Sequence, residues 1–367
     1  MMRLPLFEYR SPRSLDEAAR ILDGEGAQAM PLAGGTDLLP NMKRRQQVPK
    51  TLLSLRGITP LSTVRIDKDG SGSRFGACAT LSDIAADPRL RNGLTALAQA
   101  ASFVATPHIR NMATLGGNLC LDTRCNYYDQ NYEWRKAINF CLKKDGDTCW
   151  VAPGSAKCMA VSSTDTAPAL MALGARVRLV SHTGAREISL SDLYHSDGQF
   201  YLTRQPNEIL SDVLLDSLHG WHSSYWKLRR RGSFDFPVLS VAAAARITKG
   251  VVEDARIVIG SAASRPLMAA ESARLLLGRE LNADSISEVA TLAARIAKPL
   301  DNTDFDMSWR KKVTAELVSY ALRELRGEDM STERRSFTHT TWILNRAWVV
   351  PRDRTHRRGF RNLPVSR

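Results

Sequence analysis

The fold is decided by two stretches of sequence, Pro31-Leu-Ala-Gly-Gly-Thr-Asp-Leu-Leu39 and Ala113-Thr-Leu-Gly-Gly-Asn-Leu119, which we call loop 1 and loop 2. In each stretch, apolar residues are followed by two glycines and then by Thr or Asn. Because glycine has no Cβ, the backbone N–H groups of such a turn can approach an anion closely, and the next side chain adds a donor. A single diglycine is more often only a tight turn, but the pair could grip a phosphate from both sides.

Two common nucleotide-binding signatures are missing from the sequence. Neither loop is a G-x-G-x-x-G stretch, and G-x-x-x-x-G-K-[ST] occurs nowhere in the chain. The sequence therefore does not support a Rossmann or a P-loop site.

Helix and strand patterns alternate on both sides of the two loops. Ser14-Leu-Asp-Glu17 is a capping box that predicts the start of a helix. Asp69-Gly70 and Thr183-Gly184 each predict a hairpin turn between two strands. The other predicted strands and helices are strands at 27–33, 51–55, 64–66, 74–77, 175–180 and 185–188, and helices from Thr80 and over 94–104 and 167–173.

The C-terminal third of the chain has a different order of elements. Strands are predicted over 238–247 and 256–259, and helices follow at 269–277, 285–297 and 308–325. Antiparallel strands followed by helices are typical of an α+β domain. From residue 331 no period is sustained, which predicts an irregular tail.

Composition and charge indicate a globular protein in a reducing compartment. The formal net charge is +13, but residues 331–367 alone carry +7 through nine Arg, so the remainder is only modestly basic. No basic helix or aromatic RNA-binding motif supports nucleic-acid binding. The sequence shows neither a transmembrane run nor a signal peptide, so we expect a cytoplasmic protein that contacts no membrane.

Residues 120–158 form an apparent insertion that holds four of the six cysteines: Cys125, Cys141, Cys149 and Cys158. Four thiolates can hold zinc or an iron–sulfur cluster, but the closely spaced Cys pairs of zinc sites are absent. The residues themselves leave three possibilities open, namely an iron–sulfur cluster, zinc or no metal. Cys78 is interpreted as a core residue and Cys120 as a packed residue or one beside the ligand.

Loops 1 and 2 resemble the two FAD pyrophosphate loops of the flavin-binding medium subunits of the xanthine dehydrogenase and carbon monoxide dehydrogenase family. Those loops carry a G-[GN]-[ST]-[DE] and a [TS]-[ILV]-G-G-N core, matched here by 34–37 and 114–118. The resemblance implies an α+β fold: a two-part FAD-binding domain of the PCMH/CO-dehydrogenase flavoprotein type with a Cys-rich insertion, then a C-terminal α+β domain with an antiparallel sheet and helices. It implies that the FAD-binding domain covers residues 1–220, with subdomains 1–58 and 59–220 and the insertion at 120–158. The C-terminal domain would cover residues 221–328, and a basic tail would cover residues 329–367.

Two further segments resemble the same family. Ser163-Thr-Asp-Thr-Ala-Pro168 matches an Asp that contacts the ribose or adenosine part of FAD, although Asp165 could equally be a helix N-cap. Tyr225-Trp-Lys-Leu-Arg229 matches a stretch whose Lys reaches the flavin, although Lys227 could equally be a solvated charge. The FAD-binding residues that the resemblance implies are Leu32, Ala33, Gly34, Gly35, Thr36, Asp37, Leu38, Leu39, Val104, Thr114, Gly117, Asn118, Asp165 and Lys227.

The insertion, with Tyr127-Tyr128 and Trp134, resembles one branch of the family, the beta subunits of 4-hydroxybenzoyl-CoA reductases. That resemblance implies a [4Fe-4S] cluster on the four insertion cysteines and an oxidoreductase subunit that relays electrons in anaerobic aromatic degradation, without catalytic residues of its own. The implied partners are ferredoxin as donor, a small [2Fe-2S] subunit and a large molybdopterin-binding subunit, in a dimer of heterotrimers. The alternatives are the FAD subunit of another xanthine or CO dehydrogenase-type enzyme, and a zinc-stabilised scaffold or nucleic-acid-binding protein.

Overall fold

The computed structural model describes residues 3–66 and 72–338, and its first part is a small parallel sheet. Strands β1 (Glu8–Arg10), β3 (Thr51–Ser54) and β2 (Ala29–Leu32) lie in that order, and both outer strands run parallel to β3. Helix α1 (Leu15–Glu25) begins where the Ser14 hydroxyl accepts a hydrogen bond from the Glu17 N–H at 3.1 Å, which confirms the predicted helix start. Loop 1 leaves β2 and enters the short helix α2 (Leu38–Lys43).

The second part is a five-stranded antiparallel sheet with the order β4-β5-β8-β6-β7. Both predicted hairpins are present, one joining β4 (Val64–Ile66) to β5 (Gly72–Gly76) and one joining β6 (Arg176–Ser181) to β7 (Gly184–Ser189). The turn at Asp69-Gly70 lies outside the described residues. The central strand, β8 (Ile209–Asp216), was not predicted, because its residues are buried on both faces and show no alternation.

Helices pack on one side of this second sheet and carry loop 2. Helix α7 coincides with the diglycine of loop 2 and is only five residues long, and α9 begins just after Asp165. The helices of this part are α3 (Leu81–Ala86), α4 (Pro88–Gly93), α5 (Thr95–Phe103), α6 (Pro107–Arg110), α7 (Leu115–Leu119) and α9 (Thr166–Ala172). Short 3-10 turns lie at Gly26–Gln28, Thr59–Ser62, Leu190–Leu193 and Ala294–Ile296.

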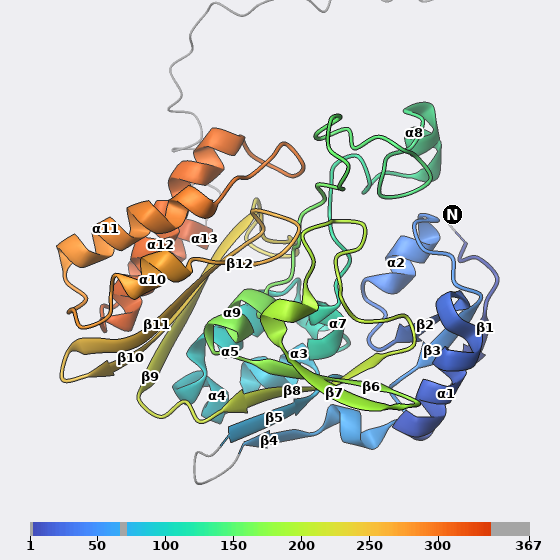
Figure 1. Ribbon diagram of the computed structural model, residues 1–367, viewed down its shortest axis with the longest axis horizontal. Coiled ribbons are helices and arrows are strands. Elements are labelled where there is room, and N and C mark those ends of the chain that lie inside the picture. The colour runs from blue at the N-terminus through green and yellow to red at the C-terminus, as the bar shows by residue number, and fades with distance from the viewer. Residues whose placement is uncertain (1–2, 67–71, 339–367) are drawn as a thin grey trace, which may run out of the picture.

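The C-terminal part is a four-stranded antiparallel sheet, in the order β12-β11-β10-β9, with a helical layer on its outer face (Figure 1). Its strands are β9 (Trp221–Leu228), β10 (Leu239–Thr248), β11 (Val251–Gly260) and β12 (Leu267–Met268). Its helices are α10 (Ala270–Arg274), α11 (Ala283–Ala293), α12 (Met307–Leu325) and α13 (Ser331–Thr338). Residues 239–245 are all buried, because α5 and α9 cover the other face and join the two parts in one core.

Helix α13 differs from the irregular tail that the sequence predicted from residue 331 onward. Met330 and Phe337 are buried in the core of the C-terminal part, and Arg334 donates to the Glu324 carboxylate at 3.0 Å. The helix is held by these tertiary contacts, and eight polar-rich residues give too short a pattern to predict it. Residues 339–367 lie outside the described residues.

The cysteine-rich insertion rises from the body of the molecule beside α2 (Figure 1). Its base is closed by two backbone hydrogen bonds between Arg124 and Val161, at 2.8 and 2.7 Å. Helix α8 (Tyr132–Ala137) lies at its far end, and the Arg135 guanidinium donates to the Arg44 carbonyl at 3.1 Å just after α2. Among the described helices, none has the length and apolar character that crossing a lipid bilayer demands.

Candidate cofactor-binding site

A cavity of about 380 Å³ lies where the two diglycine loops meet. Loop 1 contributes residues 31–38 to its wall, and loop 2 contributes residues 113, 114 and 116–118. The volume falls within the range of small-molecule and cofactor pockets. Of the fourteen residues predicted to bind a ligand, eleven line this cavity: Leu32, Ala33, Gly34, Gly35, Thr36, Asp37, Leu38, Val104, Thr114, Gly117 and Asn118.

The two loops touch, and the contact requires glycine. A Cβ placed on Gly34 would lie 1.9 Å from the carbonyl oxygen of Met112 and 3.1 Å from the Cα of Ala113. Gly35 has a φ of +70°, a conformation that L side chains rarely adopt. Loop 1 therefore keeps its position against the start of loop 2 only because neither glycine carries a side chain.

Loop 1 offers unused backbone donors to the cavity. In the described ranges, the N–H groups of residues 34–37 donate to no other group of the chain. Those of loop 2 are occupied, since Gly116 donates to the Ala77 carbonyl at 2.8 Å and Gly117 to the Thr114 hydroxyl at 3.1 Å. Consecutive free N–H groups in a turn favour an anion such as a phosphate.

Asn118 gives loop 2 a side-chain donor of fixed orientation. Its carbonyl oxygen accepts from the Thr164 hydroxyl at 2.8 Å, and from the N–H and hydroxyl of Thr166 at 3.0 and 2.7 Å. These three bonds use the acceptor capacity of the amide and fix which way it faces. The NH₂ group of this cavity-lining residue has no partner within the described chain, so it is left for a ligand.

Asp165 and Lys227 are buried against each other and are not part of the cavity wall. The Lys227 ammonium lies 3.0 Å from the Asp165 carboxylate and donates to the Phe103 carbonyl at 2.9 Å, while the Tyr225 hydroxyl donates to Asp165 at 2.7 Å. Burial lowers the pKa of Lys227, and the nearby carboxylate opposes that shift. Asp165 occupies the N-cap position of α9, but its side chain makes no capping bond. Lys227 is buried, so it is not the solvated charge that the sequence left open.

Leu39 is the third predicted residue outside the wall, and its side chain packs beside Gly35. The cavity lining includes cations that sequence reasoning missed: Arg44, Arg124 and Arg204. Arg124 is buried and pairs with Asp37 of loop 1 and, at 3.3 Å, with Asp129 of the insertion. Its Nε–H has no partner within the described chain. No local pattern marks these arginines, because they reach the cavity from separate segments.

Aromatic residues also line the cavity. Tyr201, Phe234 and Phe236 line the wall, and the Phe236 ring lies 4.7 Å from the guanidinium carbon of Arg124. The Phe234 N–H donates to the Ala105 carbonyl at 3.1 Å, and both residues have positive φ values of 69° and 41°. Such strained backbone tends to occur at ligand sites.

Two cysteines also line the cavity, Cys78 and Cys120. Burial raises the pKa of Cys78 to about 11 and also raises that of Cys120. Both side chains therefore remain protonated thiols at neutral pH and serve as apolar wall, which agrees with the packing roles predicted for them.

The four insertion cysteines are all buried. Burial raises the pKa of Cys125 to about 12 and that of Cys158 to about 11, and neighbouring insertion thiols add to both shifts. Cys125, Cys141 and Cys158 share a small apolar cluster with Tyr128. Among the described residues, no three His, Cys, Asp or Glu side chains are placed to hold a metal ion.

Known protein families match nearly the whole described chain. The model for the FAD binding domain in molybdopterin dehydrogenase matches residues 5–215, and that for the CO dehydrogenase flavoprotein C-terminal domain matches residues 223–325. These matches agree with the α+β fold class predicted from the sequence.

Individual relatives match over most of their length. The aldehyde oxidoreductase FAD-binding subunit PaoB of Escherichia coli is 31% identical over 329 residues, covering 86% of this chain and 98% of that protein. The carbon monoxide dehydrogenase medium chain of Afipia carboxidovorans is 27% identical over 320 residues, which cover 86% of this chain and 95% of that protein. The crystal structure of a Cu,Mo-CO dehydrogenase superposes with a TM-score of 0.73 at 25% identity, covering 89% of this chain and 99% of that chain.

Proposed function

This chain belongs to the family of FAD-binding medium subunits of the molybdopterin dehydrogenases, and on that premise we propose that it carries FAD between loop 1 and loop 2 and transfers electrons within a heteromeric oxidoreductase. The observation that carries the proposal is the cavity where both glycine loops meet, with eleven predicted ligand residues in its wall. A small [2Fe-2S] subunit and a large molybdenum subunit are the proposed partners. Substrate chemistry would take place on the large subunit.

The cavity residues fit FAD. The free N–H groups of residues 34–37 and the NH₂ group of Asn118 would hold the pyrophosphate from its two sides. The aromatic and apolar wall would exclude water from the flavin ring. Bound FAD supplies the ability to accept and release one or two electrons.

Replacing Asn118 by Asp is expected to weaken FAD binding by about 10- to 100-fold, the cost of losing one hydrogen bond to a charged group. The carboxylate keeps the bonds from Thr164 and Thr166 but presents an acceptor to the pyrophosphate. FAD affinity is measured by fluorescence titration of the flavin-depleted protein. Asn92→Asp, on the exposed surface of α4, makes the same charge change and is expected to leave the affinity unchanged. Equal affinities of the two variants would contradict the role given to Asn118.

We further propose that the insertion cysteines hold a [4Fe-4S] cluster and that the enzyme is of the 4-hydroxybenzoyl-CoA reductase type, with ferredoxin as donor. Four buried thiols of one insertion, three of which share an apolar cluster, supply the number of ligands that such a cluster takes. In that cluster each cysteine binds a different iron, so the thiols need not converge on one point as they do around a single ion. The cluster supplies one-electron transfer.

The second candidate is the FAD subunit of another xanthine or CO dehydrogenase-type hydroxylase, in which the insertion holds no iron. The matched relatives favour it, because they are named for aldehyde, carbon monoxide and nicotine oxidation. Iron and sulfide analysis separates the candidates when the protein is purified anaerobically with its partner subunits. The [2Fe-2S] subunit is removed first, so that any remaining iron belongs to this chain.

Cys141→Ser is expected to lose the iron of this chain while keeping its FAD, because Cys141 lies in the insertion and is absent from the cavity wall. Iron is measured by colorimetric assay and FAD by absorbance after denaturation. Cys78→Ser, a cysteine outside the insertion, is expected to keep the iron. Iron retained in Cys141→Ser, or iron missing from the wild type, would rule out the cluster.

A further inference from the structure

A buried ion pair at the base of the insertion reaches the flavin cavity. The Lys143 ammonium lies 2.8 Å from a carboxylate oxygen of Asp122 and donates to the Thr123 hydroxyl and the Gly198 carbonyl, both at 2.7 Å. The side chains of Lys143 and Asp122 are only 5% and 4% exposed. All three ammonium donors are used, so the charge has one fixed position.

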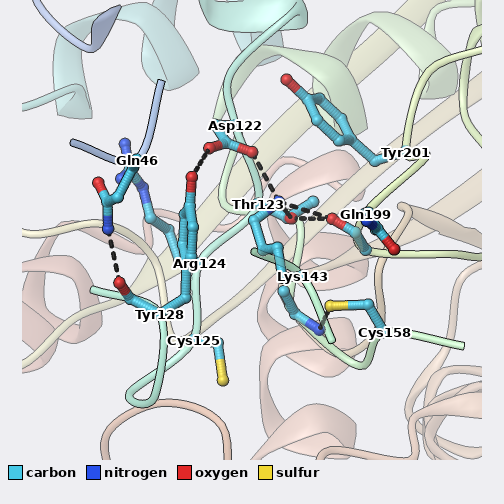
Figure 2. Close-up of polar contacts among 12 residues, drawn as sticks. Gln46, Asp122, Thr123, Arg124, Cys125, Tyr128, Lys143, Cys158, Gln199 and Tyr201 are labelled. Carbon is cyan, nitrogen blue, oxygen red and sulfur yellow. Dashed lines mark hydrogen bonds and ion pairs between the residues drawn. The ribbon is translucent and has the colours of Figure 1, made fainter. Parts of the chain in front are cut away.

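Two tyrosines surround this ion pair (Figure 2). The Tyr128 hydroxyl donates to the second carboxylate oxygen of Asp122 at 2.9 Å. The Lys143 ammonium lies 4.8 Å from the centre of the Tyr128 ring and 5.2 Å from that of Tyr201. Rings at this distance stabilise a desolvated cation. Figure 2 shows the group between Tyr201 on one side and Cys125 and Cys158 of the insertion on the other.

The ion pair joins three segments that are distant in sequence. Asp122 comes three residues after α7 and lines the cavity. Lys143 belongs to the insertion, between Cys141 and Cys149. Gly198 precedes Tyr201 and Arg204, which line the cavity. One lysine of the insertion therefore fixes two separate parts of the cavity wall.

Lys143 is the cation that neutralises Asp122 within the described chain. Arg124, which also lines the cavity, pairs instead with Asp37 and Asp129. Without Lys143, a buried carboxylate would face the cavity with hydrogen bonds but no counter-charge. An unpaired negative charge there would oppose the binding of an anionic cofactor and the uptake of electrons by it.

We propose that Lys143 and Asp122 are a positioning pair through which the insertion sets the charge and the shape of the flavin cavity. This inference rests on the proposed binding of FAD in that cavity, but it holds whether or not the insertion cysteines carry iron. It gives the insertion a second role: its lysine keeps a cavity-lining carboxylate neutralised and holds the wall segment that carries Tyr201.

The test compares Lys143→Met with the double variant Asp122→Asn/Lys143→Met, each made in the full chain and purified with the partner subunits. Flavin reduction potential is measured by redox titration and FAD affinity by fluorescence. Lys143→Met is expected to lower the potential and to weaken FAD binding by about tenfold or more, as when a charge-assisted interaction is lost. The double variant, which has a neutral pair, is expected to recover most of both losses. Lys136→Met, an exposed lysine of the same insertion, is expected to match the wild type.

Unchanged potential and affinity in Lys143→Met would overturn the inference. A double variant no better than Lys143→Met would also overturn it, since that result would mean that only packing was lost. Iron is measured in every preparation, so an iron-free wild type would refute the cluster while the flavin measurements still decide the role of the pair. A wild type that binds no FAD would overturn both the proposed function and this inference.

Discussion

Gly34→Ala is expected to weaken FAD binding by at least about 100-fold, the loss that follows when two hydrogen bonds to a charged group are broken at about 1.5–3 kcal/mol each. The added Cβ would lie 1.9 Å from the carbonyl oxygen of Met112 and 2.7 Å from its carbonyl carbon. Both are backbone atoms, so no side chain can rotate away to relieve the overlap. Loop 1 must therefore separate from loop 2, which divides the two halves of the cavity.

The effect of Gly34→Ala is measured as the ratio of flavin to protein after purification and as the dissociation constant for added FAD. Gly24→Ala is the matched control, because a Cβ on that glycine of α1 would meet no atom within 4 Å. The control is expected to bind FAD as the wild type does. Full flavin content in Gly34→Ala would mean that close contact between the loops is not needed to bind the cofactor.

Lys227→Met is expected to destabilise the protein by about 3–5 kcal/mol, the usual cost of removing one partner from a buried ion pair. The side chains of Lys227 and Asp165 are 1% and 3% exposed, so solvent cannot compensate for the lost charge. Asp165 would keep only the hydrogen bond from Tyr225, and the Phe103 carbonyl would lose its bond from Lys227. Chemical denaturation of the full chain gives the free energy of unfolding.

Two further variants test whether the stability lost in Lys227→Met comes from the unpaired charge. Asp165→Asn/Lys227→Met leaves no unpaired charge and is expected to recover a large part of the stability. Lys312→Met, on the exposed face of α12, is expected to stay within about 0.5 kcal/mol of the wild type. If Lys227→Met instead keeps wild-type stability and changes the flavin absorption spectrum, Lys227 contacts the flavin, as the sequence resemblance implied.

The fold was predictable wherever a local signal set the structure. Turn residues identified both hairpins, and Ser14 identified the start of α1. Strand β8 carries no such signal, since a central strand buried on both faces loses the alternation that identifies strands with one buried face. Helix α13 is held by tertiary contacts of Arg334 and Phe337, which no local pattern contains.

The site was predictable in its glycine loops and less so elsewhere. Gly34 and Gly117 follow from a backbone requirement that is visible in the sequence itself. Arg124 and Tyr201 reach the cavity from irregular segments, so only the folded chain brings them there. Asp165 and Lys227 were predicted as FAD contacts but lie outside the cavity wall, and their mutual pairing is a contact across 62 positions that sequence alone does not give.

A density map of the complex, isolated anaerobically with its partner subunits, would show directly where the cofactor binds. We expect one FAD per chain, with its pyrophosphate against residues 34–37 of loop 1 and Asn118 of loop 2. FAD bound elsewhere on the chain, or a cavity between these loops that is filled by protein side chains alone, would contradict it.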